Sequence, residues 1–537
     1  ITSKERMAMA GKRFGGAEAA YGAGMASAAG TKEAAETAIA VLKGGGTVVD
    51  AAIAGSAMLA VMIPNATSIG GDLLCLVKLA GQPILAVNAT GAAPKRASIE
   101  AYKALGHRFV PEFGGLAVQG PGLVAGWQAL HERWGTKPLA ELLAPAITLA
   151  RDGFPAGWRV SSAAQRHAAE YAGLPGFASV FAPGGAAIKE GARFVQPALA
   201  RTLATIAEKG PRAFYEGPIA RDIARAVQQA GGFLAEDDLA EIKADVLPVL
   251  TARYRGLEIA SQPPVTQGLI LLRALRLLEE LAPEPRRISA AQFWTHAARA
   301  LRRAFDERVA ILRDGPEARA QAEAIVAGRA ESLGLPRFEF AGVADNTSKI
   351  SIMDRHGNGV ALIQSVYAEL GSGVVAEESG VLLNNRMIAF FLDPARANHL
   401  APGRRTMHTL HTFMASDAKG LKWIGGSPGG DNQPQVNLQV LARILDFGEA
   451  PEAAVAAPRW SIVPGSKPKD IATQASGVEC EAGVPPEVQA SFAAAGFAVA
   501  EKRDLRAGSS KIVGRDVRPG ALGAFADWRR EGDVAAG

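Results

Sequence analysis

Cysteine is nearly absent from the sequence, which has 537 residues and only Cys75 and Cys480. Two cysteines in different halves of the chain form neither a disulfide framework nor the paired spacing of a zinc site. Long apolar runs are also missing, because the most apolar early run, residues 51–63, is too short to span a bilayer and ends at Pro64. We therefore expect a reducing compartment and a cytoplasmic protein; a periplasmic location stays open because the first residue is not Met.

Runs of basic residues are absent as well, although the net charge is +5, with 58 Lys and Arg against 53 Asp and Glu. The basic residues occur singly or in pairs and are not interleaved with aromatics, which argues against nucleic-acid binding. We interpret them as solvated faces, and we expect neither nucleic acid nor membrane as a partner. With 48% hydrophobic residues, the chain can bury a large core, in two lobes or in one large domain.

The order of predicted elements indicates layers of helices and sheets. Residues 1–30 are rich in Gly and Ala with little periodicity, and we expect them to wrap the surface. Strands are predicted within residues 64–91 and 252–262, and short strands with Gly turns predominate after residue 347. The predicted helices span residues 31–46, 47–63, 120–136 (with a Pro in its first turn), 138–153, most of 198–333, 433–448 and 485–496.

Residues 343–365, VADNTSKISIMDRHGNGVALIQS, have the pattern of a β-hairpin. The alternation in KISIMD is followed by a polar turn around His356 and by an apolar strand. Thr347 and Ser365 are equally far from His356, so their hydroxyls are predicted to face each other at the open end. From this pattern alone, an ordinary cross-strand hydrogen bond explains the two hydroxyls without any catalytic role.

The same hairpin belongs to a longer series of motifs. TSKISIMDRHGNGVALIQSVYAELGSGVVAEESGVLLNNRM, with PNATSIGGD upstream and GGSPGG downstream, resembles the gamma-glutamyltransferase family of N-terminal-nucleophile hydrolases, from about Met25 to Asp527. The resemblance implies an α+β fold, a four-layer αββα sandwich, with no metal or organic cofactor. It also implies an inactive precursor that cuts itself before a Thr, which then becomes the nucleophile.

In this sequence the matching residue is Thr347. Its hydroxyl can attack the carbonyl of Asn346, and hydrolysis of the resulting ester leaves Thr347 with an α-amine of pKa roughly 7.7 to 8, a suitable base. The resemblance implies two products, a large fragment, residues 1–346, and a small one, residues 347–537, which stay associated as one intertwined domain. Ser365 matches the family position that supports the nucleophile. A dimer of such heterodimers is one further expectation.

Gly429 and Gly430, in GGSPGG, match the paired glycines whose N–H groups form the oxyanion hole of the family. Without the resemblance, a plain Gly-rich turn is an equally good explanation. The stretch also fits the G-x-S-x-G pattern of α/β-hydrolases around Ser427. That hypothesis fails because Pro428 has no N–H to offer and because no His follows His411.

The positions that read the amino-acid end of a γ-glutamyl group in the family are all changed. The changed residues are Thr90 for an Arg, Tyr367 for an Asn, Arg386 for a Gln, Ala389 for an Asp, and His408 and Thr409 for two Ser. Loss of the Asp removes the partner of an ammonium, whereas Arg386 adds a fork suited to a carboxylate. The pocket is thus expected to reject a free α-amine and to accept a small or differently placed anion.

Plainer interpretations of the pocket residues remain open. Arg386 has Glu377 or Glu378 as candidate ion-pair partners, and His408 and His411 are candidates for satisfied core histidines. The spacing of these two histidines is weak evidence for a metal, because no carboxylate or cysteine set accompanies them.

The motifs GSGVVAEESGVLLNNR, LAPGRRTMHTLHT, GGDNQPQ and IGGD resemble the oxamate amidohydrolase branch of the family. We therefore predict an amidohydrolase whose substrate is a small amide, one that bears a carboxylate. Two alternatives remain: a hydrolase or transferase of γ-glutamyl donors with a rearranged pocket, and a binding protein that does not mature. Turnover of a γ-glutamyl anilide would support the first, and a chain that stays whole would support the second.

Overall fold

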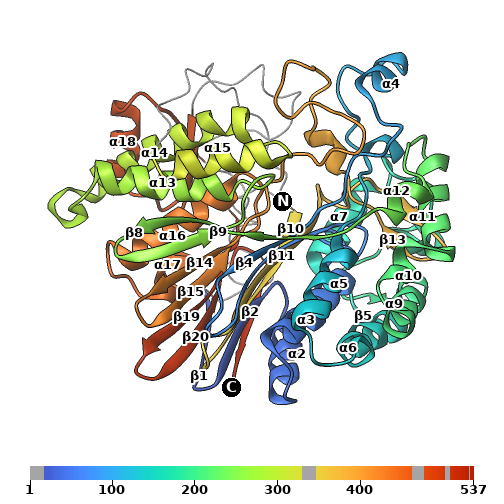
Figure 1. Cartoon of the computed structure of the whole chain (residues 1–537), viewed down its shortest axis with the longest axis horizontal. Helices are drawn as coiled ribbons and strands as arrows, with labels where there is room; N and C mark the ends of the chain where they lie inside the picture. The colour runs from blue at the N-terminus through green and yellow to red at the C-terminus, as the bar shows by residue number, and fades with distance from the viewer. Residues whose placement is uncertain (1–16, 329–345, 463–476, 502–507, 531) are drawn as a thin grey trace.

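Two seven-stranded antiparallel sheets face each other in the computed structural model, which describes residues 17–328, 346–462, 477–501, 508–530 and 532–537 (Figure 1). The first sheet has the order β21 (Asp533–Ala536), β2 (Met25–Ala29), β10 (Asn346–Asp354), β11 (Gly359–Tyr367), β3 (Asp72–Lys78), β4 (Leu85–Ala89) and β7 (Asp245–Pro248). The second has the order β1 (Glu18–Gly22), β20 (Ala521–Ala526), β19 (Lys511–Arg518), β15 (Gly420–Gly426), β14 (Phe413–Asp417), β9 (Leu257–Ser261) and β8 (Leu250–Tyr254).

Helices cover the outer face of each sheet, which gives the αββα arrangement that the sequence predicts (Figure 1). On the first sheet α3 packs against β10 and β11, whereas α13 and α16 pack on the second. The helices on the side of the first sheet are α2 (Lys32–Lys43), α3 (Val48–Met62), α5 (Leu123–Trp134), α6 (Leu139–Asp152), α7 (Trp158–His167), α8 (Phe177–Phe181), α9 (Pro197–Lys209), α10 (Arg212–Tyr215), α11 (Pro218–Gln229) and α12 (Glu236–Ala240). Those on the side of the second are α13 (Gly268–Leu281), α14 (Ala290–Ile311), α15 (Pro316–Val326), α16 (Asn432–Leu445), α17 (Pro451–Ala456) and α18 (Pro486–Ala494).

Smaller elements complete the described part of the chain. A three-stranded sheet contains β16 (Trp460–Ile462), β17 (Gly477–Cys480) and β18 (Ala498–Glu501), and two strand pairs join β12 (Val375–Ala376) to β13 (Val381–Leu382) and β5 (Phe154–Pro155) to β6 (Arg193–Phe194). The short helices are α4 (Ile99–Ala104), η1 (Gly115–Ala117), η2 (Pro183–Gly185), η3 (Pro285–Arg287) and η4 (Arg386–Ala389). Over the described residues, no helix combines the length and apolarity needed to cross a bilayer.

Small and large apolar side chains together fill the space between the two sheets. Ala26, Ala28 and Ala361 of the first sheet meet Val513 and Ala524 of the second in one apolar cluster. On the opposite face of β10, Ile350 and Ile352 belong to the core under the helices. Side chains alternate between the two faces of a strand, and every residue of β10 except the last is buried. Both faces of β10 are therefore covered, and the strand lies at the centre of the molecule.

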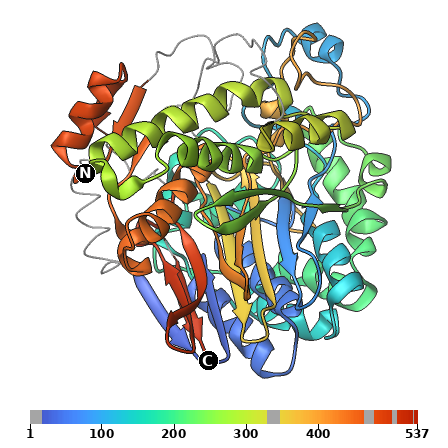
Figure 2. The ribbon, with the colours of Figure 1, turned by 60° about the vertical axis from the view of Figure 1, so that its left-hand side comes forward.

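The central strands come from distant parts of the sequence. In Figure 2 the yellow strands β10 and β11 lie beside blue strands from the first hundred residues. β2 pairs with β10, from Ile350 opposite Ala29 to Asp354 opposite Met25, and β3 pairs with β11. A chain cut before Thr347 would therefore remain joined by backbone hydrogen bonds on both sides of the hairpin.

Several predicted elements match the structure, and the N-terminal prediction is wrong. α2 begins after the cap Thr31, which accepts from the backbone N–H of Ala34, and α3 is buried nearly all round, both as expected. Residues 18–22 and 25–29, expected to wrap the surface, form β1 and β2 instead; residues 1–16 lie outside the described part. An Ala-rich alternation carries little hydrophobic contrast, although small residues are what close sheet packing requires. Pro121 precedes α5 rather than lying in its first turn.

Candidate active site

Thr347 lies at an irregularity of the predicted hairpin. The register of β10 and β11 is regular from Met353 opposite Gly359 back to Ser348 opposite Gln364, and it shifts between Ser348 and Asn346. Such a bulge re-aims a side chain next to a regular ladder. The Thr347 hydroxyl donates to Ser365 Oγ at 3.2 Å, so the two hydroxyls face each other as the sequence predicts.

Ser365 connects the Thr347 hydroxyl to the carbonyl that precedes it. Its own hydroxyl donates to the Asn346 carbonyl oxygen at 2.6 Å, and its oxygen accepts from the Tyr367 N–H at 2.8 Å. One donated and two accepted hydrogen bonds use the full capacity of a Ser hydroxyl. In the uncleaved chain, the Ser365 hydroxyl thus polarises the carbonyl next to Thr347.

The turn between β15 and α16 holds the predicted oxyanion glycines. Gly429 has φ 129° and Gly430 has φ 54°, a range that suits Gly. A Cβ on Gly429 would also lie 3.1 Å from the Cα of Gly508. From the start of α13, the Gln267 side-chain amide donates to the Gly430 carbonyl at 2.8 Å. The turn therefore has a defined backbone conformation, and a side chain from outside the turn holds it by a hydrogen bond.

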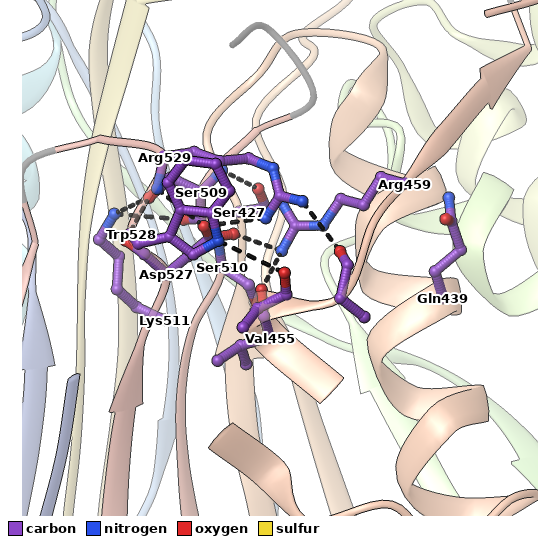
Figure 3. Close-up of polar contacts among 12 residues, drawn as sticks. Ser427, Gln439, Val455, Arg459, Ser509, Ser510, Lys511, Asp527, Trp528 and Arg529 are labelled. Carbon is purple, nitrogen blue, oxygen red and sulfur yellow. Dashed lines mark hydrogen bonds and ion pairs between the residues drawn. The ribbon is translucent and has the colours of Figure 1, made fainter. Parts of the chain in front are cut away.

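Ser427 fastens the same turn to the start of β19 (Figure 3). Its hydroxyl donates to the Pro428 carbonyl at 2.8 Å and accepts from the Ser509 N–H at 2.9 Å. The next residue, Ser510, donates its N–H to Asp527, which is ion-paired with buried Arg459 and Arg529. Ser427 is thus occupied by structural hydrogen bonds, which agrees with its rejection as a nucleophile.

Asp72 organises the predicted pocket, and the sequence prediction missed it. It is the register partner of Ser365 on β3, so the two side chains lie on the same face of adjacent strands. Arg386 Nε donates to Asp72 Oδ2 at 3.0 Å, and His408 Nε2 donates to the same oxygen at 3.1 Å. The Arg386 guanidinium lies over the Tyr367 ring, 4.2 Å from its centroid. These four side chains are buried.

The ion-pair alternatives considered for Arg386 are wrong. Arg386 pairs with Asp72 rather than with Glu377 or Glu378, and Glu378 pairs with Arg225 at 2.8 Å. The signal that points to Asp72 is the acidic residue in PNATSIGGD, within a stretch otherwise rich in Gly and small polar residues.

Burial and mutual contacts set the charges of this cluster. Burial by itself raises the pKa of Asp72, but the Arg386 charge and the His408 hydrogen bond bring the net pKa below its usual range. Burial and the Arg386 charge lower the pKa of His408 to about 4. His408 is therefore neutral at pH 7, with Nδ1 accepting from the Leu410 N–H and its proton on Nε2.

Three atoms of this cluster lack a hydrogen-bond partner. Arg386 Nη1, Arg386 Nη2 and Asp72 Oδ1 are buried, and no described residue bonds them. Buried polar atoms are nearly always satisfied in folded proteins. Two donors and one acceptor in one place match a ligand that offers a carboxylate and an N–H group.

The family model described as Gamma-glutamyltranspeptidase matches residues 34–537. The chain belongs to the gamma-glutamyltranspeptidase family. It is 34% identical over 429 residues to the glutathione hydrolase-like YwrD proenzyme of Bacillus subtilis, covering 78% of this chain and 81% of the relative. It is 33% identical over 443 residues to the oxamate amidohydrolase proenzyme of Klebsiella pneumoniae, covering 80% and 83%.

A solved structure extends the likeness to nearly the whole chain. The cephalosporin acylase of Bacillus halodurans superimposes with a TM-score of 0.86 at 30% identity, and 97% of each chain is covered. Relatives of this chain are thus hydrolases, several of them named as proenzymes. These likenesses show an amidohydrolase with the N-terminal-nucleophile fold.

Two predicted members of the gamma-glutamyltranspeptidase pocket have other bonds in the structure. The Thr90 hydroxyl donates to Asn88 Oδ1 at 3.0 Å, and no hydrogen bond in the described part of the chain joins it to Arg386 or Thr347. Thr409 is buried, and its carbonyl accepts from Gln267, the residue that also holds Gly430. The hydrogen bonds of the pocket thus centre on Asp72, and the Thr90 and Thr409 roles stay predictions.

Proposed function

We propose that this protein is a self-cleaving amidohydrolase that uses Thr347 as its nucleophile and takes a small amide bearing a carboxylate, such as oxamate. The observation that supports it best is the hydroxyl chain from Thr347 through Ser365 to the Asn346 carbonyl. Arg386, whose buried guanidinium has two N–H donors without a partner among the described residues, lies beside these two hydroxyls.

Self-cleavage starts from the uncleaved geometry. The Thr347 oxygen attacks the Asn346 carbonyl carbon, the C–N bond breaks, and the hydroxyl proton ends on the departing nitrogen. Water then hydrolyses the ester, which leaves a carboxylate on Asn346 and restores the Thr347 hydroxyl. Fragments 1–346 and 347–537 stay together as one intertwined domain, because β10 pairs with β2 and β11 pairs with β3.

Turnover uses the new terminus. The α-amine of Thr347 takes the proton from its own hydroxyl, which attacks the amide carbon, and it returns the proton to the leaving nitrogen. Ser365 orients the hydroxyl, and the N–H groups of Gly429 and Gly430 stabilise the oxyanion. Ammonia leaves, and water releases the acid from the acyl-Thr347 intermediate.

The proposed substrate lies between the nucleophile and the Arg386 guanidinium. Thr347, Ser365 and Asp72 occupy three adjacent strands, each about 4.8 Å from the next. In the proposed complex the carboxylate accepts from Arg386 Nη1 and Nη2, and an amide N–H donates to Asp72 Oδ1. Tyr367, His408 and Thr409 line the acyl pocket. The Asp72 carboxylate partly neutralises the Arg386 guanidinium. The main contribution of Asp72 is therefore to fix the orientation of the guanidinium, rather than to increase the positive charge that attracts the substrate.

A γ-glutamyl donor is the second candidate, favoured by one observation. The sequence predicts rejection of a free α-amine because Ala389 replaces an Asp, but Asp72 Oδ1 offers an unsatisfied acceptor next to Arg386. An α-amine and an α-carboxylate would satisfy the same three atoms. The two candidates differ in length, since the γ-glutamyl carbonyl is farther from its carboxylate than the amide carbon of oxamate is.

The decisive experiment compares the intact mass and N-terminal sequence of wild type and Thr347→Ala, followed by a substrate panel. We expect two fragments in the wild type, the smaller beginning Thr-Ser-Lys-Ile, and one chain in the variant. Ammonia release from oxamate, without cleavage of a γ-glutamyl anilide, supports the first candidate; the reverse supports the second. A wild-type chain that stays whole would leave the non-catalytic binding protein as the explanation.

A further inference from the structure

Arg159 contacts the residue that precedes the proposed cleavage point. Its Nη2 donates to Asn346 Oδ1 at 2.7 Å, a contact between residues 187 positions apart. Arg159 is the second residue of α7, on the large fragment. None of the sequence motifs points to it, because it lies far from all of them along the chain.

This contact holds the Asn346 side chain, and a separate hydrogen bond holds its carbonyl. The Asn346 carbonyl accepts from the Ser365 hydroxyl, while the Asn346 side chain accepts from Arg159. Asn346 is also the first residue of β10, beyond the register shift, and among the described residues its ladder partner is Tyr367 alone. A residue at a strand end with a single ladder partner needs another contact to hold its carbonyl in one direction.

We propose that Arg159 is a positioning residue for self-cleavage and not for turnover. The inference rests on the proposed function, in which Thr347 attacks the Asn346 carbonyl. Before cleavage, the guanidinium holds the Asn346 side chain and thereby keeps the carbonyl on the Ser365 hydroxyl, in reach of Thr347 Oγ1. After the C–N bond breaks and water has added, Asn346 is no longer bonded to Thr347, so the contact no longer orients a reacting atom.

The two reactions of Thr347 therefore differ in their need for Arg159. Both use the same nucleophile, Ser365 and the same glycines, but only self-cleavage has Asn346 as its acyl group. A side chain that merely supported the fold would affect both reactions, whereas a ligand of the substrate would affect turnover alone.

The test follows cleavage of the full chain made by cell-free synthesis, as the appearance of the 347–537 fragment after synthesis is stopped. A hydrogen bond from a charged donor justifies an expected slowing of about tenfold or more in Arg159→Gln. Asn346→Ala should also slow cleavage, and the double variant should be no slower than Arg159→Gln alone, because both changes remove the same hydrogen bond between Arg159 and Asn346. Arg159→Lys should restore part of the rate. Arg201→Gln, an exposed Arg on α9, is the control.

Turnover per mole of cleaved protein is the second measurement. After complete cleavage, Arg159→Gln should match the wild type in kcat and KM for the amide substrate. A changed KM would assign Arg159 to the substrate pocket and overturn the proposal. Melting in the uncleavable Thr347→Ala background tests the fold: a large drop caused by Arg159→Gln would assign slow cleavage to misfolding, which also overturns it.

The outcomes separate this inference from the function on which it rests. If the wild type is cleaved before Thr347 and Arg159→Gln is cleaved at the same rate, only the role of Arg159 is refuted. If the wild type itself stays whole, the proposed function fails first and the inference fails with it.

Discussion

The two halves of the site are built in opposite ways. The proposed nucleophile half, Thr347 and Ser365, lies on neighbouring strands of one hairpin, 18 residues apart. The recognition half joins Asp72 to Arg386 across 314 residues and to His408 across 336. The first half can form as soon as the hairpin does, whereas the second exists only when the sheet is complete. The proposed nucleophile thus depends on local sequence, whereas the proposed substrate recognition depends on the assembled sheet.

The largest expected effect concerns the nucleophile half. Thr347→Ala should abolish both self-cleavage and turnover, because no other group described near the Asn346 carbonyl is proposed to attack it. Thr347→Ser keeps a hydroxyl and should retain both reactions at a reduced rate. Intact mass and ammonia release measure the two outcomes. Cleavage before residue 347 in the Ala variant would show that Thr347 is not the nucleophile, and the division of the site into a nucleophile half and a recognition half would then fail.

The next effect concerns stability in the recognition half. Asp72→Ala should leave the Arg386 guanidinium buried without a counter-charge, which costs about 3–5 kcal/mol of unfolding free energy. The paired variant Asp72→Leu with Arg386→Met should recover most of that loss. Urea denaturation in the Thr347→Ala background compares single chains. If Asp72→Ala and the paired variant were equally stable, the idea that the Asp72 and Arg386 charges compensate each other would be wrong.

Acid should destabilise the folded protein through His408, a member of the recognition half. The pKa of His408 is about 4 in the folded protein and 6.5 without its surroundings. Between about pH 6.5 and pH 4, His408 is therefore protonated in the unfolded chain but neutral in the folded protein. Stability should fall by about 1.4 kcal/mol per pH unit from about pH 6 towards pH 4 through this one group. His408→Asn should flatten the dependence of urea denaturation on pH.

The smallest effect separates recognition from chemistry. Asp72→Asn with Arg386→Gln removes both charges together, so no unpaired ion remains in the pocket. Its KM for oxamate should rise about tenfold or more, since charge-assisted bonds to the carboxylate are lost, while kcat changes less. Turnover of a small amide without a carboxylate should weaken less, because such a substrate loses only the charge of the Asp72 acceptor. A fall in kcat alone would place Arg386 in the chemistry rather than in recognition.

Much of the nucleophile half is predictable from the sequence, because it depends on neighbouring residues. The equal spacing of Thr347 and Ser365 from His356 predicts their contact, which the structure confirms at 3.2 Å. The bulge that shifts the register at Asn346 is not predictable from alternation alone. Caps and periodicity likewise predict α2 and α3, since helix starts depend on side chains within one turn.

The sequence by itself determined the hairpin, the buried helices and the glycine turn, since each follows from local backbone preferences and side-chain alternation. Only the tertiary structure decided that Asp72, and not Glu377 or Glu378, pairs with Arg386, and that Arg159 reaches Asn346. It also placed the Ala-rich residues 25–29 as a strand beside β10. The physical reason is the same in each case. Strand order and sheet packing bring these residues together, and neither can be predicted from the spacing of residues along the chain.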